Sequence, residues 1–403
     1  MTSPSAETGL AYLSRTQEYA LAVVVAVVTA NAYYIHPIIG EVARDFGVGD
    51  AEIGVVPALN QLALALGIFL LLPLGDRYSN RTLCIAFVTL QSLFMLAMAL
   101  AQQLALFTLA STLLGLVTIA PYLIPAFASK RVAPERLGQV TAILTAGVIF
   151  GILVARVGAG VIAEQYGWRS VYWIAFTLMA SVTILLPVVM RSDTASDKRQ
   201  GGNYLGLLTS VFTLAREHRD MLLSAAIQAF NFASFTATWL ALALYLTSDE
   251  MGYGVDTVGY LAGIAAVSIF STPRLGKWAD RVGPRRARMI MAVIQLFAAA
   301  LYWPLGSSAW LLIVPLTLSN LVGPTIDVTG RMTFLALEPQ IRTRLTTTYI
   351  VIMFIGGAIG SILGTAVFDW GGWLGTCALL VGISAAVLAL STRAHWRWSP
   401  ETR

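Results

Sequence analysis

The segment "GKWADRVGPRR", residues 276–286, joins two long apolar stretches of the chain. A related segment, "PLGDRYSNR", stands at residues 73–81 and also joins two apolar stretches. The aspartates of the two copies, Asp76 and Asp280, are 204 positions apart. Two similar polar links at this spacing indicate that the chain contains an internal repeat.

Two further pairs of residues repeat at nearly the same spacing. Pro134 and Pro339 stand 205 positions apart, and so do Trp168 and Trp373. Three anchors at one offset predict two homologous halves. The segment "RSDTASDKRQGGN", residues 191–203, is polar and flexible in composition, so it is predicted to link them.

The composition indicates a membrane protein. Of 403 residues, 57% are hydrophobic and only 12% are charged, whereas soluble domains have about 25% charged residues. No charged residue occurs between Arg81 and Lys130, or between Arg288 and Asp327. Each gap is long enough for two membrane spans of about 20 residues, and spans of this kind must be helical because lipid offers no hydrogen bonds.

Twelve membrane helices are predicted, six in each half, so the expected class is an all-α membrane protein. Their predicted ranges are 17–39, 52–74, 82–102, 104–128, 138–164, 168–190, 220–247, 256–275, 286–306, 308–336, 345–368 and 371–392. The predicted domains are a cytoplasmic tail (1–16), a first bundle (17–190), a linker (191–219), a second bundle (220–392) and a cytoplasmic tail (393–403).

The basic residues predict the orientation. All but four of the 26 lysines and arginines fall in the tails and in the loops on the side of the tails. Arg44 and Arg169 lie on the opposite side, and Arg156 and Arg331 lie within predicted spans. Because positive loops stay in the cytoplasm, both termini are expected there, in a bacterial inner membrane. The dispersed charge does not indicate a nucleic-acid partner.

Motifs of enzymes are missing from the sequence. There is no HExxH, CxxC, phosphate-binding loop or nucleophile elbow, and the two cysteines lie in separate predicted spans. We therefore expect neither an enzyme, nor a metal site, nor ATP-driven transport, and no cofactor.

The segment at 276–286 resembles the cytoplasmic signature of major facilitator transporters, Gly-x-x-x-Asp-Arg-x-Gly-x-Arg-Arg, at every defined position. The first copy departs from it at Leu72 and Ser79. The chain is most similar to the twelve-helix drug:proton antiporter branch. This resemblance implies a lock between the halves that opens and closes during alternating access. The lock residues that it implies are Asp76, Arg77, Arg81, Asp280, Arg281, Arg285 and Arg286.

Two positions depart from that branch. The branch usually has an arginine in helix 4 where Ser111 stands here, four residues before Gly115. It also has a Gly-Pro pair in helix 5 where this chain has Ala155 and Arg156. The proton-relay residues of the branch therefore do not transfer directly.

Glycines at four-residue spacing predict close helix packing. Gly147 and Gly151 lie on helix 5, and Gly356, Gly360 and Gly364 lie on helix 11. Small residues at this spacing let helix backbones approach one another within a membrane.

Polar and aromatic residues within the spans predict a central binding cavity. The stretch "TANAYYIHP", residues 29–37, places an amide, two phenols and an imidazole in the first span, and helix 7 repeats this pattern loosely. Such side chains suit a partly apolar ligand that accepts and donates hydrogen bonds. Tyr33 and Tyr34 could instead belong to an interfacial belt. The candidate cavity residues are Asn31, Tyr33, Tyr34, His36, Asn60, Gln61, Tyr122, Arg156, Gln228, Asn231, Phe232, Phe235 and Trp239.

Charges within spans are costly and mark functional sites. Asp327 and Arg331 lie four residues apart on helix 10, so they share a face and can pair. They are either a structural pair or the proton-coupling site, with His36 as the next candidate and Glu18 as a weaker one. Arg156 could bind an anionic group, or could keep His36 neutral through charge repulsion.

The expected function is export of small amphipathic or aromatic compounds by proton antiport, with small molecules, protons and the bilayer as partners of a monomer. Export rests on the branch resemblance. A proton-coupled importer or carrier of an organic-acid or sugar-like metabolite is an alternative, which Arg156 as an anion anchor would favour. A non-transporting membrane sensor is a second alternative. The polar residues within the spans argue against it, because a protein that had lost transport could have leucine at those positions.

Overall fold

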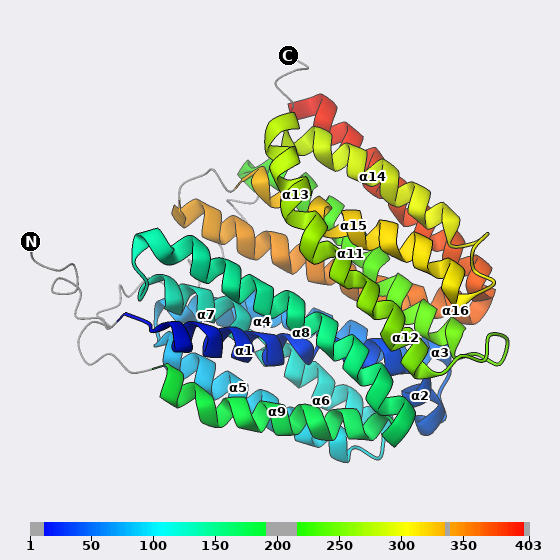
Figure 1. The fold of residues 1–403 in the computed structure, drawn as a ribbon, viewed down its shortest axis with the longest axis horizontal. Helices are drawn as coiled ribbons and strands as arrows, with labels where there is room; N and C mark the ends of the chain where they lie inside the picture. Colours follow the sequence, from blue (N-terminus) through cyan, green and yellow to red (C-terminus); the bar gives the residue numbers. More distant parts are fainter. Residues whose placement is uncertain (1–11, 191–215, 335–338, 399–403) are drawn as a thin grey trace, which may run out of the picture.

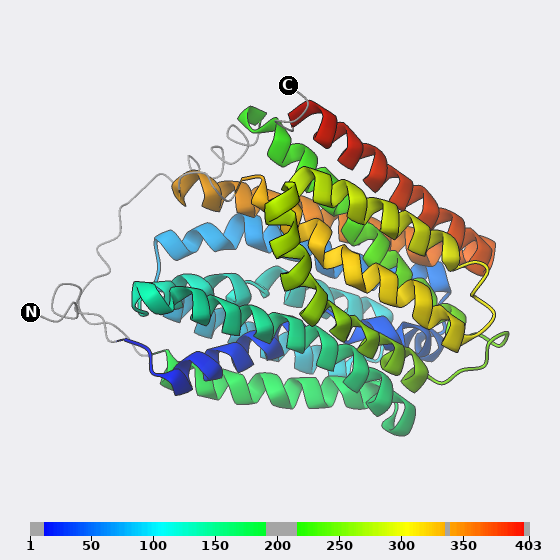
Figure 2. The same cartoon turned by 45° about the horizontal axis from the view of Figure 1, so that its top comes forward.

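Helices make up the secondary structure of residues 12–190, 216–334 and 339–398, which the computed structural model describes. Two bundles diverge from a common end and give the molecule the outline of a V (Figures 1 and 2). The first bundle contains α1 (Arg15–Ala30), α2 (Ile35–Phe46), α3 (Asp50–Ile53), α4 (Val55–Leu71), η2 (Leu72–Asp76), α5 (Asn80–Leu100), α6 (Leu104–Val117), α7 (Ala120–Ser129), η3 (Pro134–Arg136), α8 (Leu137–Tyr166) and α9 (Trp168–Val189). The second contains α11 (Arg219–Leu246), α12 (Val255–Ala262), η4 (Gly263–Ala266), α13 (Val267–Val282), α14 (Pro284–Leu301), α15 (Ala309–Met332) and α16 (Pro339–Trp398).

The predicted class of all-α membrane protein is confirmed. Ten helical segments of the described chain are long and apolar enough to cross a membrane. The last of them includes both arms of α16, which bends at Gly372, where φ is 56° and ψ is −154°. α14 is outside the ten and carries three arginines near its start. The ten segments, α14 and the bend in α16 are consistent with twelve spans. The proposed domain boundaries stay a prediction, and residues 191–215 of the linker lie outside the described part.

The first predicted helix, 17–39, is interrupted in the structure. α1 ends at Ala30, a turn covers residues 31–34, and α2 continues to Phe46. Pro37 explains the break, because it has no N–H to donate to the carbonyl of Tyr33 and its ring would clash with that carbonyl. Residues 29–37, on which the prediction of a cavity was based, therefore span a break between two helices. A second break, at residues 118–119, separates α6 from α7 four residues after Leu114 and just before Pro121.

Glycines bring helix backbones into contact in both halves. A Cβ atom on Gly151 of α8 would lie 2.2 Å from the carbonyl oxygen of Ala26 in α1. In the second half, a Cβ atom on Gly360 of α16 would lie 2.3 Å from the carbonyl oxygen of Ala233 in α11. The repeat thus uses the same device twice, as the four-residue spacing predicts.

We call the end where α1 begins and α16 finishes the terminal end, and the opposite end the far end. The repeated tryptophans pack at the far end of each half. Trp168 lies edge-on to Phe107, with 5.5 Å between ring centroids. Trp373 stacks on Tyr245 at 4.4 Å and donates from Nε1 to the backbone oxygen of Tyr302 at 3.2 Å. Each of the two repeated tryptophans therefore packs at a helix junction.

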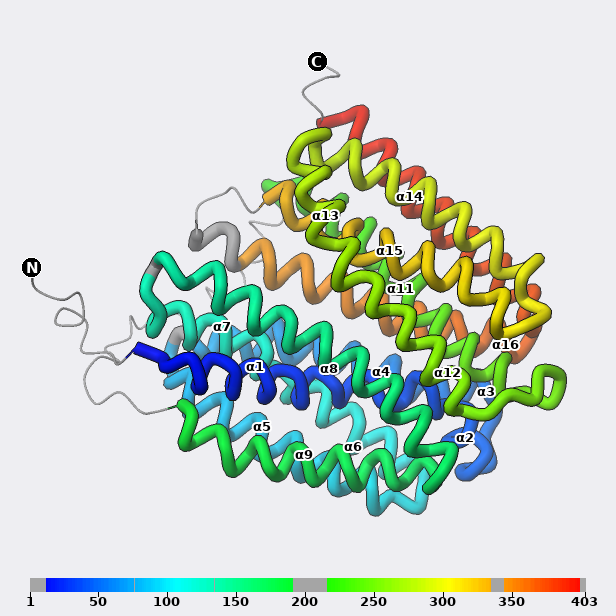
Figure 3. Tube along the Cα trace, viewed as in Figure 1, coloured from blue at the N-terminus to red at the C-terminus, as the bar shows by residue number. Residues whose placement is uncertain are grey.

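The halves contact one another closely at the far end, as the tube in Figure 3 also indicates. Oε2 of Glu164 accepts a hydrogen bond from the backbone N–H of Val255 at 2.8 Å. A Cβ atom on Gly160 of α8 would lie 2.8 Å from the Cα atom of Gly259 in α12. Arg44 also donates across the halves, to the backbone oxygen of Thr247 at 3.3 Å. The bundles therefore meet tightly where they converge.

Gly151→Ala is expected to destabilise the protein, by about 1–3 kcal/mol, because the new methyl group would overlap the backbone of α1. Gly158→Ala is the matched control, since no atom lies within 4 Å of a Cβ atom at that position. Its higher helix propensity should leave stability unchanged or raise it by up to about 1 kcal/mol. Thermal unfolding of the two detergent-solubilised variants checks this. Equal unfolding midpoints for the two variants would contradict a close contact between Gly151 and the backbone of α1.

Candidate functional site

A cavity of about 490 Å³ lies between the two halves. This volume falls within the range of about 300–1,000 Å³ typical of small-molecule sites. Its wall is built by α1, α4, α7, α8 and the breaks at residues 31–34 and 118–119 from the first half, and by α11, η4, α13, α14, α15 and α16 from the second half. Both halves therefore contribute to one site.

One face of α11 supplies the aromatic part of the wall. Gln228, Asn231, Phe232, Phe235 and Trp239 all line the cavity, since their spacing of three or four residues keeps them on one side of a helix. The rings of Phe232 and Phe235 are stacked, with centroids 5.5 Å apart. Nδ2 of Asn231 donates to Oε1 of Gln228 at 3.0 Å. This face therefore offers flat apolar surface beside amide groups.

Arg156 of α8 reaches the cavity among aromatic rings. Its side chain is only 1% exposed. The guanidinium carbon lies 4.4 Å from the ring centroid of Phe235, 4.7 Å from that of Trp239 and 5.3 Å from that of Tyr33. Tyr33 belongs to the first half, whereas the other two rings belong to α11 of the second half. The guanidinium is thus held in an aromatic cage that spans both halves.

No protein acceptor in the described chain bonds the guanidinium of Arg156: its Nε, Nη1 and Nη2 atoms are all buried and without a hydrogen-bond partner. A charged side chain at the centre of a membrane helix costs at least about 2.5–3.5 kcal/mol. Desolvated cation–π contacts return about 2 kcal/mol or more. The rings therefore offset part of this cost, but they do not satisfy the N–H donors.

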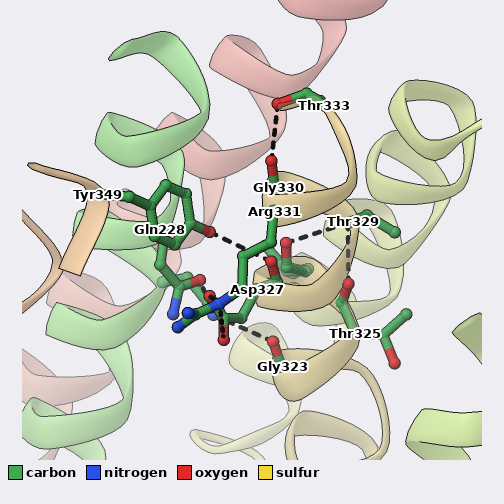
Figure 4. Close-up of polar contacts among 11 residues, drawn as sticks. Gln228, Gly323, Thr325, Asp327, Thr329, Gly330, Arg331, Thr333 and Tyr349 are labelled. Atoms are coloured by element: carbon green, nitrogen blue, oxygen red, sulfur yellow. Dashed lines mark hydrogen bonds and ion pairs between the residues drawn. The ribbon is translucent and has the colours of Figure 1, made fainter. Parts of the chain in front are cut away.

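A second arginine in the same wall has a carboxylate partner. Nε of Arg331 donates to Oδ1 and Oδ2 of Asp327 at 3.0 and 3.1 Å. Figure 4 shows this pair on α15, beside Gln228 of α11 and Tyr349 of α16. The hydroxyl of Tyr349 donates to the backbone oxygen of Asp327 at 3.2 Å. Asp327 and Arg331 are 24% and 28% exposed, so the pair is accessible from the cavity that it lines.

His36 lies behind the cavity wall. It is fully buried, and neither ring nitrogen has a hydrogen-bond partner among the described residues. Its ring is 5.3 Å from that of Tyr33 and 6.4 Å from that of Phe235. It therefore touches the rings of the Arg156 cage without lining the cavity.

Four other predicted cavity residues also lie outside the wall, and contacts between helices explain three of them. Nδ2 of Asn31 donates to Sδ of Met179 in α9 at 3.1 Å. Nδ2 of Asn60 donates to the backbone oxygen of Ser111 in α6 at 2.7 Å. Gln61 packs against Gly357 of α16. Tyr34 is buried in the apolar core, and Tyr33 and Tyr122 do line the cavity.

Several polar wall residues were not predicted from the sequence. Gln295 on α14 and Ser319 and Asn320 on α15 line the cavity. The signal was available, because each is a polar residue in an uncharged apolar stretch. Glu18, the weaker candidate for proton coupling, is instead paired with Arg136 at 2.8 Å.

The described contacts of the proposed lock residues lie within their own halves. Nε of Arg81 donates to the backbone oxygen of Met190, and Nη2 donates to that of Pro187 at 3.3 Å, so Arg81 caps the end of α9. Arg285 forms an ion pair with Asp220 at the start of α11. Three further lock residues, Asp280, Arg281 and Arg286, are exposed, as is Arg77. The side chain of Asp76 lies outside the described part. A lock between the halves remains a prediction.

Comparison with known proteins places this architecture in one family. The family model described as Major Facilitator Superfamily matches residues 21–326 and 224–403. The chain is 28% identical over 393 residues to an uncharacterized transporter, YgaY, of Escherichia coli, covering 97% of this chain and 96% of that one. It is 24% identical to the multidrug resistance protein MdtG of Escherichia fergusonii, covering 73% and 72% of the two chains.

Solved structures share the fold at low sequence identity. A mutant of the nucleoside transporter NupG matches with a TM-score of 0.76 and 14% identity, over 94% of this chain and 99% of that one. A bacterial homolog of the human lysosomal transporter Spinster, inward-facing and occupied, matches with a TM-score of 0.75 and 16% identity, over 95% and 98% of the chains. At these identities the likeness establishes the fold alone.

Cysteine labelling should separate wall residues from buried ones. In a background with Cys84→Ala and Cys377→Ala, Asn231→Cys and Phe235→Cys are expected to react readily with a small, water-soluble thiol reagent. Asn31→Cys should react slowly, because Asn31 lies outside the cavity wall and packs against α9. Labelling rates of the purified protein measure this difference. Rapid labelling at position 31 would contradict the assigned wall.

Proposed function

The chain belongs to the major facilitator superfamily and is a membrane transporter, and from this premise we propose that it exports small amphipathic or aromatic compounds in exchange for protons. The central cavity between the halves carries the proposal, because it is large enough for such compounds and combines stacked rings with amides. The similarity to MdtG, whose name describes a multidrug resistance protein, supports export.

Alternating access supplies the mechanism. The close contacts between the halves at the far end leave the terminal end as the proposed side of entry. The positive-inside rule supports a cytoplasmic terminal end, since 22 of the 26 basic residues belong to that side. In this proposal, the cavity loads from the cytoplasm in the described arrangement. Rocking of the halves then separates the far-end contacts and exposes the cavity to the outside.

Asp327 is the proposed carrier of the coupling proton. Coupling requires a group whose protonation depends on the side to which it is exposed. Arginine keeps its proton in the working range, so Arg156 and Arg331 cannot serve. Asp327 lines the cavity, and its charge is balanced by Arg331 in the described arrangement. A motion that separates the pair would leave the carboxylate to be neutralised by a proton, and a motion that restores the pair would release that proton.

A second candidate function is proton-coupled transport of an organic acid, in either direction. The observation that favours it is Arg156, a cavity cation with no protein acceptor among the described residues. Purified protein in proteoliposomes separates the two functions. Substrate moving one way should drive protons the other way in antiport and the same way in symport. An internal pH-sensitive dye reports the sign, and no substrate-dependent pH change would contradict both.

Asp327→Asn is expected to abolish substrate-driven proton movement while the protein still binds substrate, because asparagine keeps the shape of the side chain but cannot take up a proton. The measurement is dye-reported pH change in proteoliposomes, beside equilibrium binding of the same substrate. His36→Gln is the comparison variant. If coupling survives Asp327→Asn and is lost in His36→Gln, the coupling proton belongs to His36 instead.

Gly160→Val is expected to impair transport without unfolding the protein. A side chain at this position would press on the backbone of α12, since a Cβ atom there lies 2.8 Å from both Gly259 Cα and Val255 O. It should therefore hold the halves apart at the far end. Gly158→Val, on the same helix but with no atom within 4 Å of its Cβ position, is the control. Uptake assays at equal expression measure the effect. Equal transport by the two variants would argue against closure at this contact.

A further inference from the structure

The cavity carries an unbalanced positive charge. Among the described residues, three charged ones line it: Arg156, Asp327 and Arg331. The carboxylate of Asp327 offsets the guanidinium of Arg331, with which it forms two hydrogen bonds. With Asp327 ionised, one net positive charge remains, at Arg156. A cavity of this charge, with largely apolar walls, attracts anions and repels cations.

Arg156 can be compared with two other arginines of the described chain, the partly exposed Arg331 and the buried Arg288. Arg331 has its carboxylate partner. Arg288 of α14 is fully buried, yet its Nη1 atom donates to Oγ of Ser224 at 2.8 Å. Arg156 alone among these three has no partner at any of its nitrogens, although it is 1% exposed and lines the cavity. Its unmet donors therefore lie beside the cavity in which a transported compound is proposed to bind.

The aromatic cage does not satisfy the N–H donors of the guanidinium. Phe235 and Trp239 lie 4.4 and 4.7 Å from the guanidinium carbon, so their π faces cover the cation. Rings of this kind attract the positive charge but accept no strong hydrogen bond from its N–H groups. An oxyanion accepts such bonds in pairs, since the planar fork of arginine matches a carboxylate. The same rings provide apolar surface next to that oxyanion.

From these observations we infer that Arg156, with Tyr33, Phe235 and Trp239, forms an oxyanion-binding subsite, and that the transported compounds are aromatic or apolar organic acids. The carboxylate binds the guanidinium, and the apolar body lies along Phe232 and Phe235 of α11. This inference rests on the proposed transport function, but the binding experiments that test it require neither a direction of transport nor proton coupling.

Equilibrium binding to the wild-type protein is the first test. Isothermal titration calorimetry uses the full chain in nanodiscs of neutral phosphatidylcholine at pH 7.5, without any gradient. The probes share one ring system: 2-naphthoate is anionic, 2-naphthamide is neutral and 2-naphthylmethylamine is cationic. We expect naphthoate to bind about 10- to 100-fold more tightly than the amide, as hydrogen bonds to charged groups contribute, and the amine to bind most weakly. Absence of naphthoate binding, or equal or tighter binding of the amide or amine, would overturn the inference.

Variants then assign the preference to one residue. Arg156→Gln should remove the preference for naphthoate over naphthamide while keeping amide binding, which also shows that the variant is folded. Arg156→Lys should recover only part of it, because lysine lacks the planar fork. Arg169→Gln is the matched control: Arg169 is exposed outside the cavity, 2.5 Å from Asp45, and its loss should leave the preference intact. If Arg156→Gln keeps the full preference for naphthoate over naphthamide, the assignment is overturned. If Arg156→Gln misfolds, an unchanged preference in Arg156→Lys overturns it instead.

The bilayer is the other source of an oxyanion. Repeating the titration with phosphatidylglycerol in place of part of the phosphatidylcholine distinguishes a lipid phosphate from a soluble acid. Unchanged naphthoate binding supports the soluble acid. Weaker binding that depends on Arg156 would assign the subsite to a lipid headgroup and overturn the substrate class. These binding experiments use no gradient, so they can contradict the oxyanion subsite while proton-coupled transport is still observed. They can equally support the subsite while proton-coupled transport is not observed.

Discussion

The absence of hydrogen-bonding partners in the hydrocarbon core decides where this chain can leave the helical conformation. A break exposes backbone N–H and C=O groups, so within a membrane it must be buried in protein or must border a cavity. The break at Gly54, between α3 and α4, is buried in protein against Thr365 of α16. Three further breaks interrupt the spans of the described chain at residues 31–34, 118–119 and 263–266, the last as the 3₁₀ segment η4. Each contributes to the cavity wall, through Ala32, Tyr33, Thr118, Ala265 and Ala266. Breaks and cavity are therefore parts of one arrangement.

Arg156 adds a second dependence, between the charge of the cavity and the contact of the halves. It stands on α8 of the first half, and two of its three rings stand on α11 of the second half. Separation of the halves must therefore take rings away from a buried cation, which makes the uncompensated charge more costly. An anion bound to the guanidinium would lower that cost. Occupancy of the subsite would then favour the movement between the two arrangements, which is the requirement for a carrier that moves mainly when loaded.

Sequence reasoning predicted the features that depend on local spacing. The repeat, the helical class, the Asp327–Arg331 pair and the cavity face of α11 all follow from periodicity along single helices. In the first span it included Tyr33, which lines the cavity. It also included Asn31, Tyr34 and His36, which do not, because Pro37 breaks the helix and changes its phase after Ala30. Asn60 was predicted to line the cavity but bonds Ser111 instead, and because Ser111 lies on another helix, spacing along the sequence does not reveal this contact. The cage around Arg156 gathers rings from separate segments, and no spacing within one helix encodes it.

The charge of the substrate and the sign of proton coupling are linked by the electrostatics of this cavity. Arg156 and Asp327 line the same cavity, whose net charge rises by one when Asp327 takes up a proton. A bound anion and a proton on Asp327 therefore stabilise one another, and linkage requires this effect to be reciprocal. A neutral aromatic compound feels no such attraction, so its exchange for a proton depends on competition for space or for Arg331. Movement of an organic acid together with a proton is thus the electrostatically favoured combination, whereas antiport is better matched to a neutral substrate. Determining the charge of the compound that binds at Arg156 therefore constrains the coupling mechanism itself.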